Sequence, residues 1–81
     1  MPHRIWRPNI DGVRHTVAAR WTPWTHEGEL VLNKDIIKTW GARLASLDIN
    51  FEIEGHAAFL RNTLIGFDLY IAGEKVPHSL A

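Results

Sequence analysis

The fold is decided by residues 47–76, LDINFEIEGHAAFLRNTLIGFDLYIAGEKV, in which apolar and polar side chains alternate. Ile49, Phe51 and Ile53 are separated by single polar residues, which is the pattern of a β-strand with one buried face. Gly55 interrupts the pattern and indicates a turn. The stretch is therefore predicted to begin with a strand that lies on the hydrophobic core.

The same stretch contains two further strand signals. Residues 56–61 form a second apolar-rich segment, and residues 67–71, FDLYI, alternate again. The sequence AGEK at residues 72–75 predicts a closing turn. Residues 47–76 are thus expected to form a meander of three strands that supplies half of a core.

The beginning of the chain shows the same succession of strands and turns. Residues 3–8 predict a strand that proline ends, and the Asp11-Gly12 pair that follows is a strong hairpin signal. Residues 13–21 alternate strictly and predict one strand. Its inward face is expected to carry Val13, His15, Val17, Ala19 and Trp21.

The middle of the chain is less regular. Residues 22–28, TPWTHEG, predict a loop, and they precede a predicted strand over 29–32 and a turn over 33–35. Residues 38–47 allow a short helical turn or a strand that bends at Gly41. We favour a strand followed by a loop, because glycine in a strand often marks a bulge. The tail, residues 77–81, is expected to be disordered.

A similar sequence pattern, an internal echo, occurs in the first and second halves of the chain. Residues 30–37, LVLNKDII, align without gaps on residues 69–76, LYIAGEKV. In both segments, apolar residues, a two-residue turn, an acidic residue and a final aliphatic residue follow in the same order. Two hairpins of like design in two facing sheets would explain the echo, and so would chance similarity between short strands.

These signals together predict one all-β domain over residues 1–81, an antiparallel β-sandwich of about seven or eight short strands. A barrel of the same strands is the alternative. Each strand has one apolar and one polar face, which favours antiparallel sheets over parallel sheets covered on both faces.

Composition narrows the classes of function. Nine basic residues balance nine acidic ones, which counts against a surface that grips nucleic acid through its phosphates. The chain has no cysteine, so thiol catalysis, thiolate metal sites and disulfides are excluded and a reducing compartment is favoured. The N-terminus lacks the apolar run of a signal peptide, and no segment approaches the roughly 20 apolar residues that span a bilayer. We expect a cytoplasmic protein with no nucleic-acid partner and no membrane association.

Scattered positions over residues 6–76 resemble the Fas apoptotic inhibitory molecule family. In that family, a tryptophan strand leads to a DG-x-H-x-V turn and strand, and then to a glycine-led hairpin. The segments that resemble it here are Trp6, DGVRHTV at 11–17, with two residues instead of one between DG and His15, GELVL at 28–32, FEIEGHAA at 51–58 and LYIAG at 69–73. The chain departs from the family at Asn33-Lys34, where the family has a DG pair.

The resemblance implies a compact antiparallel β-sandwich without enzymatic activity that works by contact with other proteins. In animals, such contacts of family members modulate death-receptor and survival signalling. This chain is much shorter than a two-domain family member, so it would supply one sandwich only, and we do not transfer the apoptotic role. The resemblance brings no catalytic residue with it.

The five histidines, at positions 3, 15, 26, 56 and 78, raise the question of a metal site. None of their spacings is typical of a ligand pair. Sheet pairing is the remaining way to bring His15 and His56 together. We favour the alternative, in which His15 closes the end of the core and His56 forms a hydrogen bond in a turn, and we predict no metal and no cofactor.

Catalytic signals are weak as well. Ser46 and Ser79 lack the context of an activated nucleophile, and Glu52 and Glu54 share the polar face of one strand, where solvated carboxylates are expected. No glycine-rich phosphate-binding motif occurs. We therefore predict no catalytic residue.

The tryptophans carry the functional prediction. Trp6, Trp21 and Trp40 are predicted to fill the core. Trp24 lies in the predicted loop and is either an exposed anchor or a lid that folds back over the open end of the sandwich.

We predict a non-enzymatic protein-interaction module whose partner is another protein. The predicted contact residues are Arg20, Trp21, Trp24 and His26. A carbohydrate-binding module that uses Trp21 and Trp24 is the alternative. A homodimer is also considered, because small sandwiches leave edge strands to cover.

Overall fold

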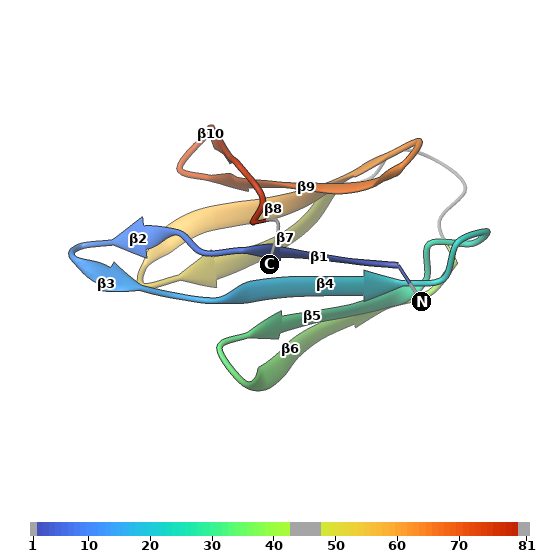
Figure 1. Cartoon of the computed structure of the whole chain (residues 1–81), viewed down its shortest axis with the longest axis horizontal. Coiled ribbons are helices and arrows are strands. Elements are labelled where there is room, and N and C mark those ends of the chain that lie inside the picture. Colours follow the sequence, from blue (N-terminus) through green and yellow to red (C-terminus); the bar gives the residue numbers. More distant parts are fainter. Residues whose placement is uncertain (1, 43–47, 80–81) are drawn as a thin grey trace.

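The computed structural model describes residues 2–42 and 48–79. These residues form ten β-strands and no helix, and none of them belongs to a helix long and apolar enough to cross a membrane. Two four-stranded antiparallel sheets are present, with a smaller two-stranded sheet beside them (Figure 1).

The first large sheet has the strand order β1-β4-β5-β6. Its members are β1 (His3–Trp6), β4 (Val17–Trp21), β5 (Gly28–Leu32) and β6 (Asp35–Trp40). The second large sheet has the order β10-β9-β8-β7. Its members are β7 (Asp48–Ile53), β8 (His56–Thr63), β9 (Gly66–Ile71) and β10 (Glu74–Val76). The small sheet pairs β2 (Asn9–Ile10) with β3 (Val13–Arg14) and extends the β1–β4 hairpin outward (Figure 1).

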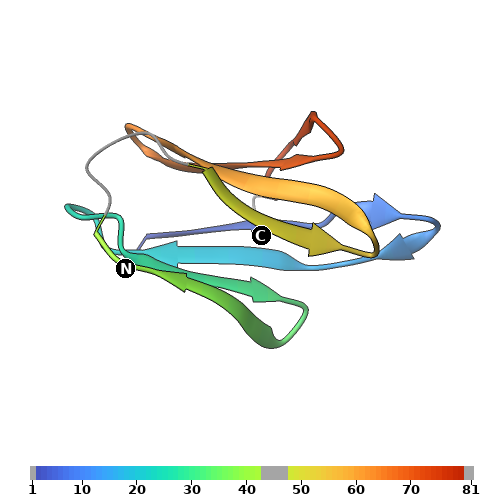
Figure 2. The same cartoon turned by 180° about the vertical axis from the view of Figure 1, so that it is seen from behind.

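The two large sheets face each other and enclose the core, as Figure 2 shows from behind. Burial follows the predicted alternation, for Ile49, Phe51 and Ile53 are buried and their polar neighbours are exposed. Burying one such side chain contributes about 1.5–3 kcal/mol. Both sheets contribute to the core, whose buried members are Trp6, Ile10, Val17, Ala19, Trp21, Leu30, Trp40, Ile49, Phe51, Ile53, Ala58, Leu60, Phe67 and Leu69. The predicted all-β antiparallel sandwich is confirmed.

Both large sheets have the same topology. Each is a meander in which neighbouring strands are antiparallel, and the β2–β3 hairpin is the only addition to the first among the described residues. The β5–β6 and β9–β10 hairpins occupy the last position in their sheets, and Leu32 pairs with Asp35 as Ile71 pairs with Glu74. The echo between residues 30–37 and 69–76 therefore corresponds to two hairpins of like design in facing sheets.

The tight hairpin turns lie together at one end of the sandwich, on the left in Figure 1. The first turn residue has φ between 49° and 59° in each case: Asp11, Asn33, Glu54 and Ala72. Such left-handed turns match the right-handed twist of paired strands. The predicted Asp11-Gly12 hairpin is confirmed, and the turn predicted over residues 72–75 is shorter, because β10 already begins at Glu74.

Residues 13–21 are not one strand. The chain bends at His15 and Thr16, where the His15 amide donates to the Pro8 carbonyl (2.9 Å) and the Asn33 amide donates to the Thr16 carbonyl (2.7 Å). Val13 therefore lies outside the sandwich and is 57% exposed, which corrects its predicted inward position. The short strands β2, β3 and β10 bring the number of strands to ten, above the predicted seven or eight.

The ambiguous segment after residue 37 begins as a strand, because β6 continues to Trp40. The register of β6 against β5 shifts between Leu30 and Val31, so the bulge comes before Gly41. Residues 43–47 of this segment lie outside the described residues. In the tail, the Ser79 amide donates to the Ile5 carbonyl (2.6 Å), and residues 80–81 lie outside the described residues.

Candidate functional site

The loop between β4 and β5 is fixed at its base by main-chain hydrogen bonds. The Thr22 amide donates to the Glu27 carbonyl (2.9 Å), and the His26 amide donates to the Thr22 carbonyl (3.0 Å). From β6, the Trp40 indole Nε1 donates to the His26 carbonyl (2.5 Å). These bonds hold the backbone on both sides of Trp24.

Two aromatic side chains connect this loop to the second sheet. His26 Nδ1 donates to Asn62 Oδ1 of β8 (2.6 Å), and the Trp21 ring meets Phe67 of β9 edge-on, with ring centroids 5.3 Å apart. Gly66 lies against the same indole, where a Cβ atom would be 2.5 Å from Trp21 Cζ2. With φ at 142°, Gly66 allows an approach of the β8–β9 turn that other residues would block.

Three large apolar side chains project from this end of the sandwich. Trp24 is 93% exposed, and Leu64 and Ile65, which form the β8–β9 turn, are 99% and 79% exposed. Figure 1 shows the two connections at the same end, opposite the tight hairpin turns. We call Trp24, Leu64 and Ile65 the apolar end. Exposed apolar groups gathered on a small protein commonly mark an interaction surface.

The four residues predicted for partner contact do not share one environment. Trp24 stands at the surface, which contradicts the alternative of a lid over the core. The Arg20 side chain is half exposed, with Nε 3.9 Å from Glu29 Oε2, and His26 is partly buried by its bond to Asn62.

Trp21 is only 3% exposed and lies in the core, where Trp6 and Trp40 also lie. The core prediction for these three tryptophans is confirmed. In this conformation the Trp21 side chain packs in the core at the base of the loop, and it does not reach the surface where a partner would bind.

Leu64 and Ile65 were not anticipated from the sequence. Their signal is two adjacent aliphatic residues between Thr63, which ends β8, and Gly66, which begins β9. Turns between strands are usually built from glycine, proline, asparagine, aspartate or serine, so this pair departs from the common turn chemistry.

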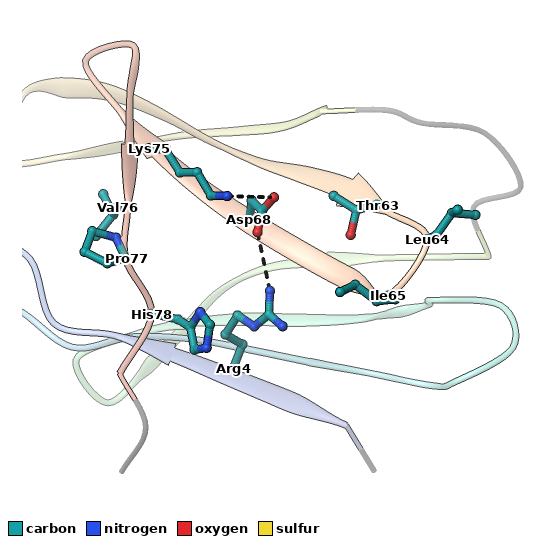
Figure 3. A pocket seen from close by; sticks show the side chains of 9 residues that line it. All are labelled: Arg4, Thr63, Leu64, Ile65, Asp68, Lys75, Val76, Pro77 and His78. Atoms are coloured by element: carbon teal, nitrogen blue, oxygen red, sulfur yellow. Dashed lines mark hydrogen bonds and ion pairs between the residues drawn. The ribbon is translucent and has the colours of Figure 1, made fainter.

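A groove of about 1030 Å³ adjoins the apolar end (Figure 3). It runs along the edge of the sandwich between β1 and the β9–β10 hairpin. The turn residues Leu64 and Ile65 lie at one end of it, and residues 76–78 lie at the other. The turn is therefore shared by the apolar end and the groove.

Charged side chains meet in the middle of the groove. Arg4 Nη1 of β1 donates to the Phe67 carbonyl (3.0 Å) and lies 3.4 Å from Asp68 Oδ1 of β9. Lys75 Nζ of β10 lies 3.8 Å from Asp68 Oδ2, and Figure 3 shows both cations converging on this carboxylate, with His78 beside Arg4. Two basic side chains thus contact one carboxylate. We call this site the cationic groove.

The outer face of the second sheet carries another cluster. Phe59 and Tyr70 stack with ring centroids 4.8 Å apart, and the Arg61 guanidinium lies 5.1 Å from both rings. A hydrogen bond to Asp48, together with its charge, raises the pKa of Arg61 above its ordinary value. The rings and the guanidinium already contact one another, so this cluster is a weaker candidate for a binding site than the apolar end.

The histidines do not assemble into a site. Asn33 Nδ2 lies 3.3 Å from Nδ1 of the buried His15, and His56 Nε2 lies 3.5 Å from Asp11 Oδ2. His15 is therefore a buried polar residue, and His56 contacts a hairpin turn. Within residues 2–42 and 48–79, no three His, Cys, Asp or Glu side chains are grouped so that they could hold a metal ion.

Comparisons with protein families, with curated proteins and with solved structures found no match to this chain. The relation to the Fas apoptotic inhibitory molecule family stays a prediction that rests on the matching residues.

Proposed function

We propose that the chain is a non-enzymatic protein-interaction module that docks through its apolar end. The observation that carries this proposal is the near-complete exposure of Trp24 and Leu64 at one end of the sandwich, where hydrogen bonds hold the loop around Trp24. Each large apolar side chain that becomes buried in an interface contributes about 1.5–3 kcal/mol. Tryptophan is enriched among the residues that dominate binding energy, and a fixed loop loses little conformational entropy on binding.

The resemblance to the Fas apoptotic inhibitory molecule family supports the same proposal. It implies an antiparallel β-sandwich that acts by protein contact, and the chain is such a sandwich. We propose this relation for the fold and the mode of action, and we propose no role in apoptosis.

Affinity capture from cells with the immobilised chain tests the proposal. The variants Trp24→Ala and Leu64→Ser/Ile65→Ser remove the apolar end, and Val13→Ser removes an exposed apolar side chain at the opposite end. We expect a partner that wild type and Val13→Ser retain equally and that the two apolar-end variants bind at least about tenfold more weakly. Equal binding by all variants, measured with the purified partner, would exclude this surface.

Carbohydrate binding remains the second candidate, because an exposed tryptophan can stack on a sugar ring. The predicted pair of stacking residues is reduced to Trp24, since Trp21 is buried. A glycan array probed with wild type and Trp24→Ala tests this function, and absence of binding to any glycan would retire it.

A homodimer is the remaining candidate assembly. The edge strand β6 exposes Ile36 and Ile37, but it also carries a bulge and the charged Lys38, features that oppose pairing between strand edges. Sedimentation velocity over a range of protein concentrations measures the assembly state directly.

A further inference from the structure

We infer that the partner presents an acidic side chain next to apolar ones, and that its carboxylate binds in the cationic groove between Arg4 and Lys75. This inference rests on the proposed function, in which the chain docks a protein, and it names the chemistry of that partner. The apolar neighbours of the acidic side chain would contact Leu64 and Ile65.

The charge balance of the groove favours an anion. Arg4 and Lys75 bring two positive charges to the single carboxylate of Asp68. Figure 3 shows the imidazole of His78 on the same side of the groove, and no second carboxylate lines it among the described residues. An incoming carboxylate would restore neutrality, and opposite charges across an interface select partners and speed their encounter.

Arg4 is oriented to receive a carboxylate. The side chain points from β1 toward the second sheet, and Nη1 contacts both the Phe67 carbonyl and Asp68 Oδ1 there. Within the described part of the chain, its Nε and Nη2 atoms form no hydrogen bond. Nη2 is therefore left to donate a hydrogen bond to an incoming carboxylate, and such a charge-assisted bond is shorter and stronger than one between neutral groups.

Lys75 is not needed to hold the sheets together. Its side chain is 61% exposed, and its 3.8 Å contact with Asp68 stays within the second sheet, because β10 and β9 both belong to that sheet. Exposed ion pairs of this kind contribute little to stability. Lys75 can therefore leave Asp68 and bind a carboxylate of the partner without loss of a contact between the sheets. The contact of Arg4 with Asp68, in contrast, links β1 of the first sheet to β9 of the second.

The position of the cations favours a protein over an anionic membrane surface. The Arg4 side chain is mostly buried between the strand edges, whereas Trp24 and Leu64 project from the end of the sandwich. A flat layer of lipid headgroups would meet the projecting side chains first. A protein surface can place a single acidic side chain into the groove while its apolar residues cover the turn.

Two synthetic peptides test the inference, acetyl-Leu-Glu-Leu-amide and its counterpart with Gln in place of Glu. Both are titrated into the ¹⁵N-labelled chain and followed by amide chemical shifts. We expect the Glu peptide to shift the amides of Arg4, Ile65 and Lys75 and to bind about fivefold more tightly than the Gln peptide, which corresponds to about 1 kcal/mol. The preference should shrink when the ionic strength rises from about 0.05 M to about 0.5 M.

The variant Lys75→Gln should lose this preference, and Lys34→Gln, which removes a lysine from the β5–β6 turn at the opposite end, should keep it. Both positions are exposed, so neither variant is expected to unfold, and thermal melts verify this. Equal binding of the two peptides, binding of neither, or an unchanged preference in Lys75→Gln would overturn the inference. Stronger binding to phosphatidylserine vesicles than to the Glu peptide would overturn it in favour of a lipid.

The two proposals fail in different ways. If capture of the partner depends on Trp24 but is the same for wild type and Lys75→Gln, the carboxylate inference is wrong and the docking function stands. If capture depends on neither residue, both proposals are wrong.

Discussion

Trp21 and Trp24 form a matched pair with opposite expected effects. They are the same residue type, at the end of β4 and in the loop that follows it, yet Trp21 is 3% exposed and Trp24 is 93% exposed. Trp21→Ala removes the ring that packs against Phe67 and leaves a cavity, which costs about 3–5 kcal/mol for a buried aromatic residue. A domain of this length has a free energy of unfolding of about 4–12 kcal/mol, so the substitution removes a large part of its stability. Trp24→Ala removes a side chain that meets only solvent, and the expected change is within about 0.5 kcal/mol.

Thermal unfolding followed by circular dichroism measures this difference. Since 1 kcal/mol shifts the Tm of a domain of this size by about 4–8 °C, Trp21→Ala should lower the Tm by about 12 °C or more, and Trp24→Ala by about 4 °C at most. Affinity for a captured partner should not follow stability among the folded variants. Trp24→Ala should bind the partner weakly although it is stable, and Val13→Ser should bind it as wild type does. Comparable losses of stability for the two tryptophan variants would refute the assignment of Trp24 to the surface and Trp21 to the core.

Three further substitutions, two beside the site and one in a hairpin turn at the opposite end, are measured by urea denaturation. Gly66→Ala should lower the free energy of unfolding by about 2 kcal/mol, because the added Cβ would collide with the Trp21 indole and the φ of 142° strains any residue other than glycine. Gly41→Ala is the control, because a Cβ at Gly41 meets no atom within 4 Å, and it should change the free energy of unfolding by less than about 0.5 kcal/mol. Ala72→Gly should raise it by about 0.5 kcal/mol, because the φ of 51° is unfavourable for alanine; a decrease would contradict this reading of the turn. Asn62→Leu should lower it by about 1–3 kcal/mol, since the His26 ring loses its acceptor, and faster hydrogen exchange at the His26 amide would show that the loop base has loosened.

Those parts of the fold that depend on neighbouring residues were predictable from the sequence. The alternation around Phe51 places every second side chain in the core, and this holds because β7 pairs with β8 in one unbroken register from Asp48 to Ile53. Asp11-Gly12 forms its hairpin for an equally local reason, since both residues adopt positive φ. The bend at His15 escaped prediction because it is held by Pro8 and Asn33, partners that alternation within residues 13–21 does not register.

The candidate site was only partly predictable, because long-range contacts decide which loop residues are exposed. The alternation correctly placed Trp21 inside, but the choice between a lid and an anchor for Trp24 depends on the bonds that His26 makes to Asn62 and Trp40. The cationic groove had no local signal at all. Its cations and the carboxylate come from β1, β9 and β10, which are brought together only when the two sheets pack.

The two ends of the sandwich differ in what their connections require, and this difference supports the choice of the site. At one end, each tight turn needs a residue with left-handed φ, so its sequence is dictated by backbone geometry. At the other end, the β4–β5 loop is longer and the β8–β9 turn places aliphatic side chains where small or polar residues would serve. The fold gains nothing from Trp24 or Leu64, because neither side chain is buried. We propose that contact with another molecule accounts for their presence at this end, and the adjoining positive groove restricts the kind of surface that fits there.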